Sequence, residues 1–251
     1  MSEHYYLSQV PDPESTTAIL TGQDAIHLAR VMRAVPGDEV FLFDGTGADY
    51  RCIIQNIQKD RVETTILEKR CPEQGPSLDL TMAVALPKGE RQKWLIEKLT
   101  ELGVARYIPL RTARGDVKYD ENVRDRLRRQ AIEASKQCGR LRIMEIMPEM
   151  SRREIMAPHL GLVQEDTVTI LAHPKSDGEF GQWSFPRFAE RFRVEGVPKR
   201  IVLAVGPVGG LTQEEVQEAV DDHWPTLDLG DMVYRVETAA IVAASLFLHL
   251  Q

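Results

Sequence analysis

The sequence predicts an α/β protein in which a small β-rich domain precedes a larger domain with a parallel sheet. Three observations support this fold class. Short strand-like runs with a hairpin signal fill residues 20–67, and the segment CPEQGPS breaks regular structure at residues 71–77. Beyond it, apolar strand-like runs alternate with amphipathic helical stretches. We therefore assign a first domain to residues 1–71 and a second to residues 78–251.

The first domain contains one clear hairpin. Two apolar runs in FLFDGTGADYRCIIQNI (residues 41–57) flank Asp44 and Gly45, with Gly47 close by, and VETTIL (residues 62–67) supplies a further strand. Residues 24–34 combine apolar and basic positions at helical spacing, which predicts one short helix. Pro72, Gly75 and Pro76 mark a linker.

The second domain alternates strands with helices. We expect strands in LTMAVAL, ARYIPL, TVTILAHP, RIVLAV and LDL. Expected helices cover residues 90–102, 122–138, 212–220 and 237–250. Gly103 and Gly139 end the first two helices. Residues 175–199 show no periodicity and are expected to form a loop.

Composition excludes several classes of protein. No apolar run is long enough to span a membrane, and the N-terminus lacks the basic and apolar regions of a secretory signal. Cys52, Cys71 and Cys138 are odd in number and have no CxxC spacing, so we expect a cytoplasmic protein without a disulfide framework or a zinc site. We expect no metal elsewhere either, because His173 has no partner ligand at metal spacing.

The net charge of −7 is unevenly distributed. The segment from Pro87 to Arg142 holds fifteen basic and eight acidic side chains, a local excess of seven positive charges. Such a basic face on an acidic body can bind phosphates. An ordinary solvated helix face is the alternative, and the same choice applies to Glu133, Gln137 and Arg140, which share one face of a helix as either an RNA contact or a salt-bridged surface.

A glycine-rich turn between a strand and a helix is the strongest local feature. In RIVLAVGPVGGLTQEEV, Gly206, Gly209 and Gly210 permit close approach of a ligand, and Thr212 with Glu215 forms a capping box. The loop is neither a Walker loop nor GxGxxG, which weakens the phosphate-binding explanations. A cofactor with an adenosine but no phosphate, such as S-adenosylmethionine, is compatible with it. A tight structural turn is the alternative.

A second polar cluster lies in LGDMVYRVETAAIVAASLFL. Arg235, Glu237 and Thr238 follow a strand end, where open α/β sheets bind ligands. The alternative is that Glu237 or Thr238 only caps the last helix. The apolar run from Ala239 to Leu248 predicts a homodimer through this helix or, alternatively, a buried core helix.

Five motifs occur in order along the chain: HLARVMRAVPGDEVFLFDGTG, KGERQKWLIEKLTELGVARYIPL, EASKQCGR, VGPVGGLTQEEV and LGDMVYRVETA. With them the chain resembles the ribosomal RNA small subunit methyltransferase E family of the SPOUT class. The resemblance implies an N-terminal PUA-like β-barrel that contacts RNA and a C-terminal α/β domain with a trefoil knot that binds S-adenosylmethionine, usually in a homodimer. The implied activity is methylation of N3 of a uridine in 16S rRNA, either free or in the assembled small subunit.

The resemblance also implies site residues. The cofactor set is Leu171, Ala172, His173, Gly206, Pro207, Gly209, Gly210, Leu229, Gly230, Val233, Arg235, Thr238 and Ala239. The RNA-facing set is Arg30, Arg33, Lys88, Arg91, Arg114 and Arg140. For catalysis we expect Glu237 or water to accept the uridine proton, and Arg114 or Arg235 to stabilise the uridine anion.

Two positions depart from the family pattern. Val208 stands where the family usually has an acidic residue, and Met232 stands where it usually has an arginine. They motivate one alternative, a non-catalytic RNA-binding or ribosome-assembly protein that keeps the fold. A nucleotide-dependent oxidoreductase is the other alternative, and the missing GxGxxG counts against it.

Overall fold

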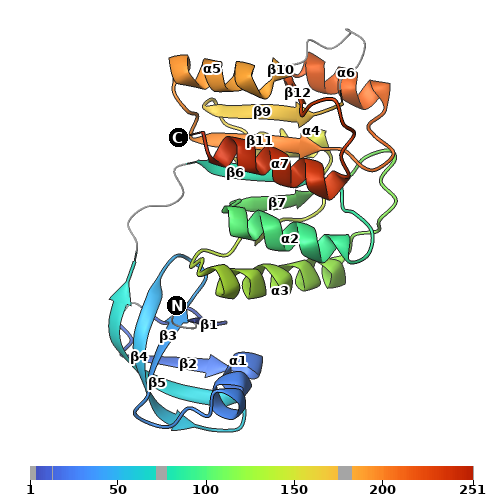
Figure 1. Ribbon diagram of the computed structural model, residues 1–251. Coiled ribbons are helices and arrows are strands. Elements are labelled where there is room, and N and C mark those ends of the chain that lie inside the picture. The colour runs from blue at the N-terminus through green and yellow to red at the C-terminus, as the bar shows by residue number, and fades with distance from the viewer. Residues whose placement is uncertain (1–3, 13, 72–77, 175–182, 251) are drawn as a thin grey trace. The chain divides into compact units, whose positions relative to one another are not determined.

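The computed structural model describes residues 4–12, 14–71, 78–174 and 183–250 (Figure 1). The chain forms two compact units. Unit 1 comprises residues 1–75 together with 132–143, and unit 2 comprises residues 76–131 and 144–251. The predicted linker residues Pro72, Gly75 and Pro76 lie outside the described residues, so the domain boundary there stays a prediction.

Unit 1 is built on a five-stranded sheet in the order β1-β3-β4-β5-β2. Its strands are β1 (His4–Tyr6), β2 (Thr17–Thr21), β3 (Glu39–Phe43), β4 (Asp49–Ile57) and β5 (Arg61–Arg70). The predicted hairpin is confirmed, since β3 and β4 pair antiparallel with Phe43 opposite Asp49. Figure 1 shows the sheet curled into a half-barrel.

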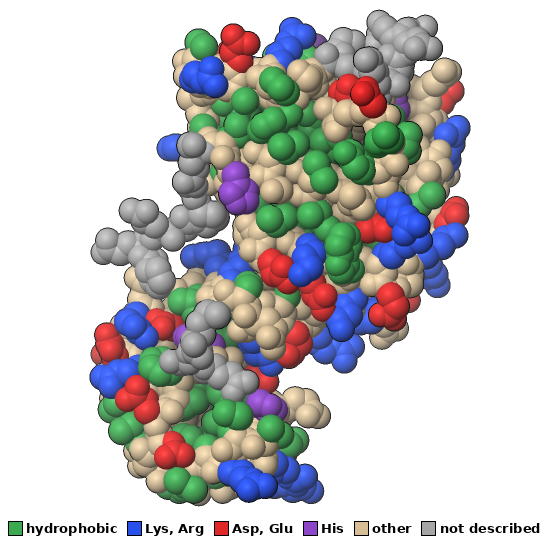
Figure 2. Space-filling view, viewed as in Figure 1, with side chains coloured by type: hydrophobic (Ala, Val, Ile, Leu, Met, Phe, Trp, Pro, Cys, Tyr) green, Lys and Arg blue, Asp and Glu red, His purple; other side chains and the backbone are tan. Residues whose placement is uncertain are grey.

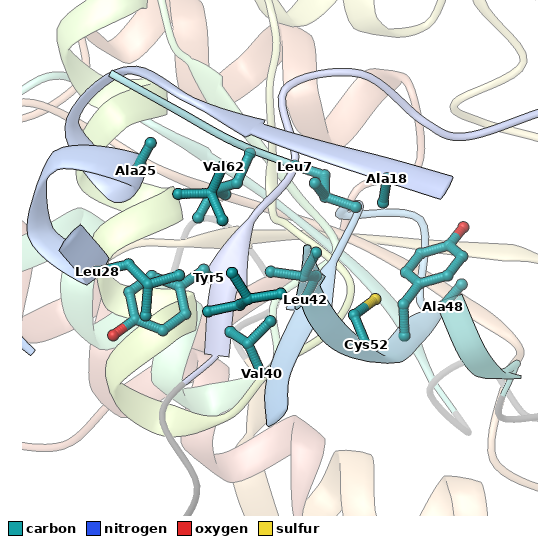
Figure 3. Close-up of a cluster of buried hydrophobic side chains, with 13 residues drawn as sticks. Tyr5, Leu7, Ala18, Ala25, Leu28, Val40, Leu42, Ala48, Cys52 and Val62 are labelled. Atoms are coloured by element: carbon teal, nitrogen blue, oxygen red, sulfur yellow. The ribbon is translucent and has the colours of Figure 1, made fainter. Parts of the chain in front are cut away.

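The core of unit 1 follows from the alternation of buried and exposed positions along these strands. Leu42, Cys52 and Val62 are fully buried and meet Leu7 on the inner face of the curled sheet (Figure 3). The sequence predicted a helix over residues 24–34. The structure forms α1 (Gly22–Ile26) followed by the π-helical turn η1 (His27–Val31).

Unit 2 is built on a seven-stranded parallel sheet in the order β10-β12-β9-β11-β6-β7-β8. Its strands are β6 (Asp79–Val84), β7 (Arg106–Pro109), β8 (Glu145–Ile146), β9 (Thr167–Ala172), β10 (Trp183–Ser184), β11 (Arg200–Val205) and β12 (Thr226–Asp228). The predicted parallel sheet is confirmed. Strand β11 lies between β9 and β6, with Ala204 beside Leu171 on one side and Ala83 on the other.

Helices fill the crossovers between these strands. They are α2 (Arg91–Leu102), α3 (Glu121–Cys138), α4 (Arg152–Ile155), the 3-10 turn η2 (Pro158–Leu160), α5 (Phe185–Glu195), α6 (Gln213–Asp221) and α7 (Val236–Leu248). Helix α7 packs against β6, β11 and α2, and Figure 1 shows α2 and α7 on the same side of the sheet. Gly103 ends α2 in the left-handed conformation, as its sequence position predicted.

The loop expected over residues 175–199 is wrong from Trp183 onward, where β10 and α5 form. Pro186 does not prevent the helix because it occupies the first turn, where no intrahelical N–H bond is needed. Phe188 and Phe192 are buried one turn apart, and the ring of Phe188 meets that of Phe247 edge-on at 5.6 Å. Packing against α7 therefore selects the helix.

Two further observations apply only to the parts of the chain that the structure describes. None of their helices combines the length and apolar character needed to cross a bilayer. No group of three or more His, Cys, Asp or Glu side chains there is arranged to hold a metal ion. The trefoil knot stays a prediction.

Candidate functional site

A cavity of about 340 Å³ opens in unit 2 at the carboxyl ends of β9, β11 and β12. Three loops surround it: the residues after β9, the glycine loop between β11 and α6, and the segment between β12 and α7. Strands that end side by side in a parallel sheet bring their following loops together, which explains how residues far apart in sequence meet here.

Each of the three loops forms one wall of the cavity, and the glycine loop (residues 206–211) forms the second. Gly210 has φ +70°, a conformation that side chains rarely adopt, and nothing lies within 4 Å of the Cβ it lacks. A Cβ on Gly206 would come 2.8 Å from Cγ of Leu211, so this position also needs glycine. The predicted capping box is confirmed, because Thr212 and Glu215 bond to each other's backbone N–H at the start of α6.

The third wall begins where β12 ends. Gly230 has φ +114°, and its N–H donates to Oδ1 of Asp228 at 2.9 Å. The side chains that follow are apolar and exposed: Met232 is 74% exposed and Val233 84%. Together with Val208 of the glycine loop, 78% exposed, they form an apolar rim around the cavity mouth.

Arg91 brings positive charge to the cavity, and a buried carboxylate holds it there. Its Nε lies 3.5 Å from Oε1 of Glu237, which is only 4% exposed. The other carboxylate oxygen, Oε2, is buried without a hydrogen-bond partner. Glu237 itself does not line the cavity, so it contacts Arg91 from behind the cavity lining.

His173 follows β9 and lines the cavity. Burial lowers its pKa below the ordinary value of 6.5, so the imidazole is neutral at pH 7. The cavity thus offers backbone groups of glycine loops, apolar side chains, a neutral imidazole and two guanidinium groups, those of Arg91 and Arg235, among its described residues.

Most of the cofactor residues implied by the resemblance lie in this lining. They are Ala172, His173, Gly206, Pro207, Gly210, Leu229, Gly230, Val233, Arg235 and Ala239. Three do not: Leu171 is buried within β9, Thr238 lies in the first turn of α7, and a Cβ on Gly209 would point at Arg114, 3.5 Å from its Cβ.

Only one of the three expected catalytic residues lines the cavity. Arg235 lines the cavity, whereas Arg114 and Glu237 do not. Arg114 was expected to extend outward toward RNA, but its Nη1 donates to the carbonyl oxygen of Gly209 at 2.9 Å. It therefore contacts the back of the glycine loop.

The expected RNA set is also dispersed. Arg91 lies in the cavity, and Lys88 pairs with Asp116 at 2.9 Å. Arg140 is half-buried, and this burial lowers its pKa to about 10. Arg30 and Arg33 are exposed.

On the helix face of EASKQCGR, Glu133 pairs with Lys136 at 2.6 Å, and Lys136 also pairs with Asp24 at 2.7 Å. These ion pairs support the salt-bridged alternative at Glu133.

Sequence reasoning missed three cavity residues of chemical interest: Asp228, Tyr234 and, in its cavity role, Arg91. Asp228 ends a strand and precedes Leu-Gly, a position that could have drawn attention to it. No local signal places Arg91 there, because it reaches the site through the packing of α2 on α7.

The residues fit S-adenosylmethionine on structural grounds. The volume lies within the range of small-ligand sites, and the lining is mainly apolar with a few polar groups. Gly210 and Gly230 leave open the space that side chains would otherwise fill. No phosphate-binding motif is present in the sequence, in keeping with an adenosine cofactor that carries a sulfonium in place of phosphates.

Comparisons with known proteins match the chain to RNA methyltransferases. Residues 73–248 match the family model of an RNA methyltransferase domain, and residues 20–67 match that of an RNA methyltransferase PUA domain. The chain is 30% identical to ribosomal RNA small subunit methyltransferase E of Bacillus subtilis over 240 residues, covering 92% of this chain and 90% of that protein. It is 28% identical to the protein of the same name from Synechocystis, covering 92% of this chain and 72% of the other.

Solved structures agree with these matches. Ribosomal RNA small subunit methyltransferase E from Neisseria gonorrhoeae, bound to S-adenosylmethionine, superposes with a TM-score of 0.78 at 25% identity and covers 98% of this chain and 96% of its own. A protein of Legionella pneumophila in complex with the same cofactor gives a TM-score of 0.80 at 26% identity, covering 98% and 97%. From the matched domains, the identity along nearly the whole chain and the shared fold, it follows that the chain belongs to the ribosomal RNA small subunit methyltransferase E family of RNA methyltransferases.

Proposed function

We propose that this protein uses S-adenosylmethionine to methylate N3 of a uridine in 16S rRNA. The observation that carries the proposal is the cavity of about 340 Å³ at the ends of β9, β11 and β12. It lies within residues 73–248, the span that matches an RNA methyltransferase domain.

The cofactor is held by the three loops of the cavity. Ala172 and His173 supply one wall, and Gly206, Pro207 and Gly210 supply the second. The third is supplied by Leu229, Gly230, Val233, Arg235 and Ala239. When bound, S-adenosylmethionine supplies a methyl group on a positively charged sulfur. Asp228 places a carboxylate in the same lining as the guanidinium groups of Arg91 and Arg235, and burial lowers the pKa of His173, so the imidazole adds no further positive charge beside the sulfonium.

The chain's own contribution to the reaction is to position the uridine and stabilise its anion. Uridine N3 must lose a proton, and the resulting negative charge spreads onto the neighbouring carbonyl oxygens. We assign Arg91 to stabilise that charge from the cavity wall and Glu237, behind it, to position Arg91. The proton passes to water, because Glu237, the carboxylate that the sequence suggested as a base, does not line the cavity.

Unit 1 is assigned to RNA. Residues 20–67 match the PUA domain of RNA methyltransferases, and Arg30 and Arg33 are exposed at the end of η1. Cations on such a surface bind phosphates and fix the position of the RNA. The substrate is small-subunit rRNA, free or in the assembled subunit, and the protein acts in the cytoplasm.

The functional form is a homodimer through the outer face of α7. Ile241, Val242 and Leu246 are only half-buried on this face, while Ala243 and Phe247 pack inward. Figure 2 shows hydrophobic side chains gathered over the part of unit 2 where Figure 1 draws α7. A second copy would cover this apolar surface.

Two measurements test the proposal. Maps of 16S rRNA modification from cells with and without the protein should differ at one N3-methyluridine. Transfer of a labelled methyl group to small-subunit RNA in vitro should require the protein. If the protein binds RNA and S-adenosylmethionine but transfers no methyl group, the non-catalytic alternative holds, and Val208 and Met232 at the cavity rim are then the first positions to examine.

A further inference from the structure

We propose that Arg114 is a positioning residue that holds the glycine loop in the shape that receives the cofactor, and thereby couples cofactor binding to RNA contact at residues 111–118. The inference rests on the proposed function. It gives Arg114 a role at the cofactor site, whereas the resemblance implied contact with RNA.

The contact between Arg114 and the glycine loop is specific. Nη1 donates to the carbonyl oxygen of Gly209 at 2.9 Å and lies 3.5 Å from that of Leu211. The aliphatic part of the same side chain covers Gly209, because a Cβ there would lie 3.5 Å from Cβ and 3.6 Å from Cδ of Arg114. One side chain thus spans the loop from Gly209 to Leu211, on the side away from the cavity.

A second contact joins the same two segments. The N–H of Ala113 donates to Oε1 of Glu215 at 2.8 Å, while Oε2 of Glu215 accepts the N–H of Thr212 at 2.8 Å. The carboxylate that caps α6 therefore also fixes the backbone next to Arg114. Residues 112–115 form a turn closed by the N–H of Gly115 and the carbonyl oxygen of Thr112, which presents Ala113 and Arg114 together.

The glycine loop needs such support. Gly210 has φ +70° and Val208 is largely exposed, so core packing holds the loop at Leu211 but does not fix its tip. Within the loop, the N–H of Gly210 bonds to the carbonyl oxygen of Pro207 at 2.9 Å. A charge-assisted hydrogen bond from Arg114 restricts the loop before the ligand arrives, which lowers the entropy lost on binding.

The coupling follows from where Arg114 is attached. Its segment also carries the exposed side chain of Lys118 and lies within the stretch with excess positive charge. If bound RNA phosphates order this segment, the contacts of Arg114 also order the glycine loop. In the same way, a bound cofactor that orders the glycine loop also orders this segment. Such linkage is reciprocal, so each ligand should raise the affinity for the other by the same factor.

The test is calorimetric titration of S-adenosylmethionine into the full chain and into three variants. Arg114→Ala should weaken binding by about tenfold, as expected for loss of a charge-assisted hydrogen bond. Arg114→Lys should recover part of the affinity, because an ammonium group can still donate to the oxygen of Gly209. Arg111→Ala is the matched control: it removes a cation from the same segment, but one that pairs with Glu154 and not with the glycine loop.

Thermal melting separates positioning from general stability. Arg114→Ala should melt close to the wild-type temperature without ligand and show a smaller upward shift with saturating S-adenosylmethionine. RNA should tighten cofactor binding in the wild type and do so less in Arg114→Ala. Wild-type affinity in Arg114→Ala, or equal weakening in Arg111→Ala, overturns the inference. Failure of the wild type itself to bind S-adenosylmethionine would instead remove the proposed function, and this inference with it.

Discussion

The guanidinium of Arg111 donates a hydrogen bond to the carboxylate of Glu154, 43 residues further along the chain. Glu154 is also the third residue of α4 and completes a capping box with Ser151. Arg111 first, and then the backbone and hydroxyl groups of Ser151, lower the pKa of Glu154 from 4.5 to about 2. This carboxylate therefore ties the end of β7 to the start of α4.

The lowered pKa makes this contact dependent on pH. Because the folded-state pKa lies below that of the unfolded chain, the carboxylate stabilises the fold above about pH 4.5, and its contribution is lost as pH falls toward 2. Glu154→Gln should cost about 1 kcal/mol or less at pH 7, since the pair is exposed to solvent, and less still at pH 3. Urea unfolding at both pH values measures this. Glu165→Gln, which removes the same charge at an exposed site, serves as control. An equal loss at both pH values would contradict the assignment.

Substitutions at the two neighbouring glycines should have different effects. Gly210→Val should abolish S-adenosylmethionine binding, because the side chain enters open space at the cavity and is strained at φ +70°. Gly209→Ala should retain binding, because its Cβ would make an ordinary contact with Arg114 at 3.5 Å. Calorimetry on both variants, with circular dichroism to confirm folding, checks the contrast. Equal affinities in the two folded variants would remove Gly210 from the site.

Arg91 and Glu237 should act on the rate of methyl transfer more than on cofactor affinity. Arg91→Lys should lower kcat by about 100-fold, as for loss of one group that stabilises a developing negative charge. Glu237→Gln keeps the size of the side chain but loses the ion pair that orients Arg91, so kcat should fall less. Steady-state kinetics at saturating RNA tests both variants. An unchanged kcat in Arg91→Lys would assign the anion to another group.

RNA affinity should depend on Arg30 and Arg33. Each Arg→Ala change should weaken binding and reduce the slope of log K against log salt by about one, because the variant makes one phosphate contact fewer and its binding therefore releases fewer counterions. Arg61→Ala is the control in the same unit, since Arg61 pairs with Glu63. Filter binding over a range of salt concentrations gives the slopes. If Arg61→Ala flattens the slope as much as the other two, the effect is one of overall charge.

The outer face of α7 should govern association. Leu246→Glu places a charge on the half-buried apolar surface and should convert a dimer into a monomer, while Glu165→Gln in another part of unit 2 should not. Sedimentation at micromolar concentrations distinguishes the two masses. A wild-type monomer at all concentrations would contradict the homodimer.

The sequence was informative where a local pattern was sufficient. The capping box at Thr212 and Glu215, the glycine at the end of α2 and the hairpin of β3 and β4 all depend on residues close in sequence, and all three are confirmed. Helix α5 was missed because its signal lies in distant packing of Phe188 on Phe247. Strand β1 was missed because three residues are too few to show a period, and its partner β3 lies far along the chain.

Local sequence patterns also predicted only part of the site. The three loops could be predicted, since each follows an apolar strand and carries glycine or polar residues. The direction of a long side chain could not: Arg114 and Arg91 are both basic residues in loop or helix-start positions, yet one contacts the back of the glycine loop and the other lines the cavity. Only the tertiary neighbours, Gly209 in one case and Glu237 in the other, distinguish them.

The position of β11 between β9 and β6 determines when the central sheet can form while the chain is being synthesised. The chain emerges from its N-terminus, so β6 and β9 are both made before the strand that joins them. Until residues 200–205 have been synthesised, each presents an apolar edge with unpaired backbone groups. The centre of the sheet therefore closes late, through contacts distant in sequence, and the nascent chain must be kept from aggregating until it does.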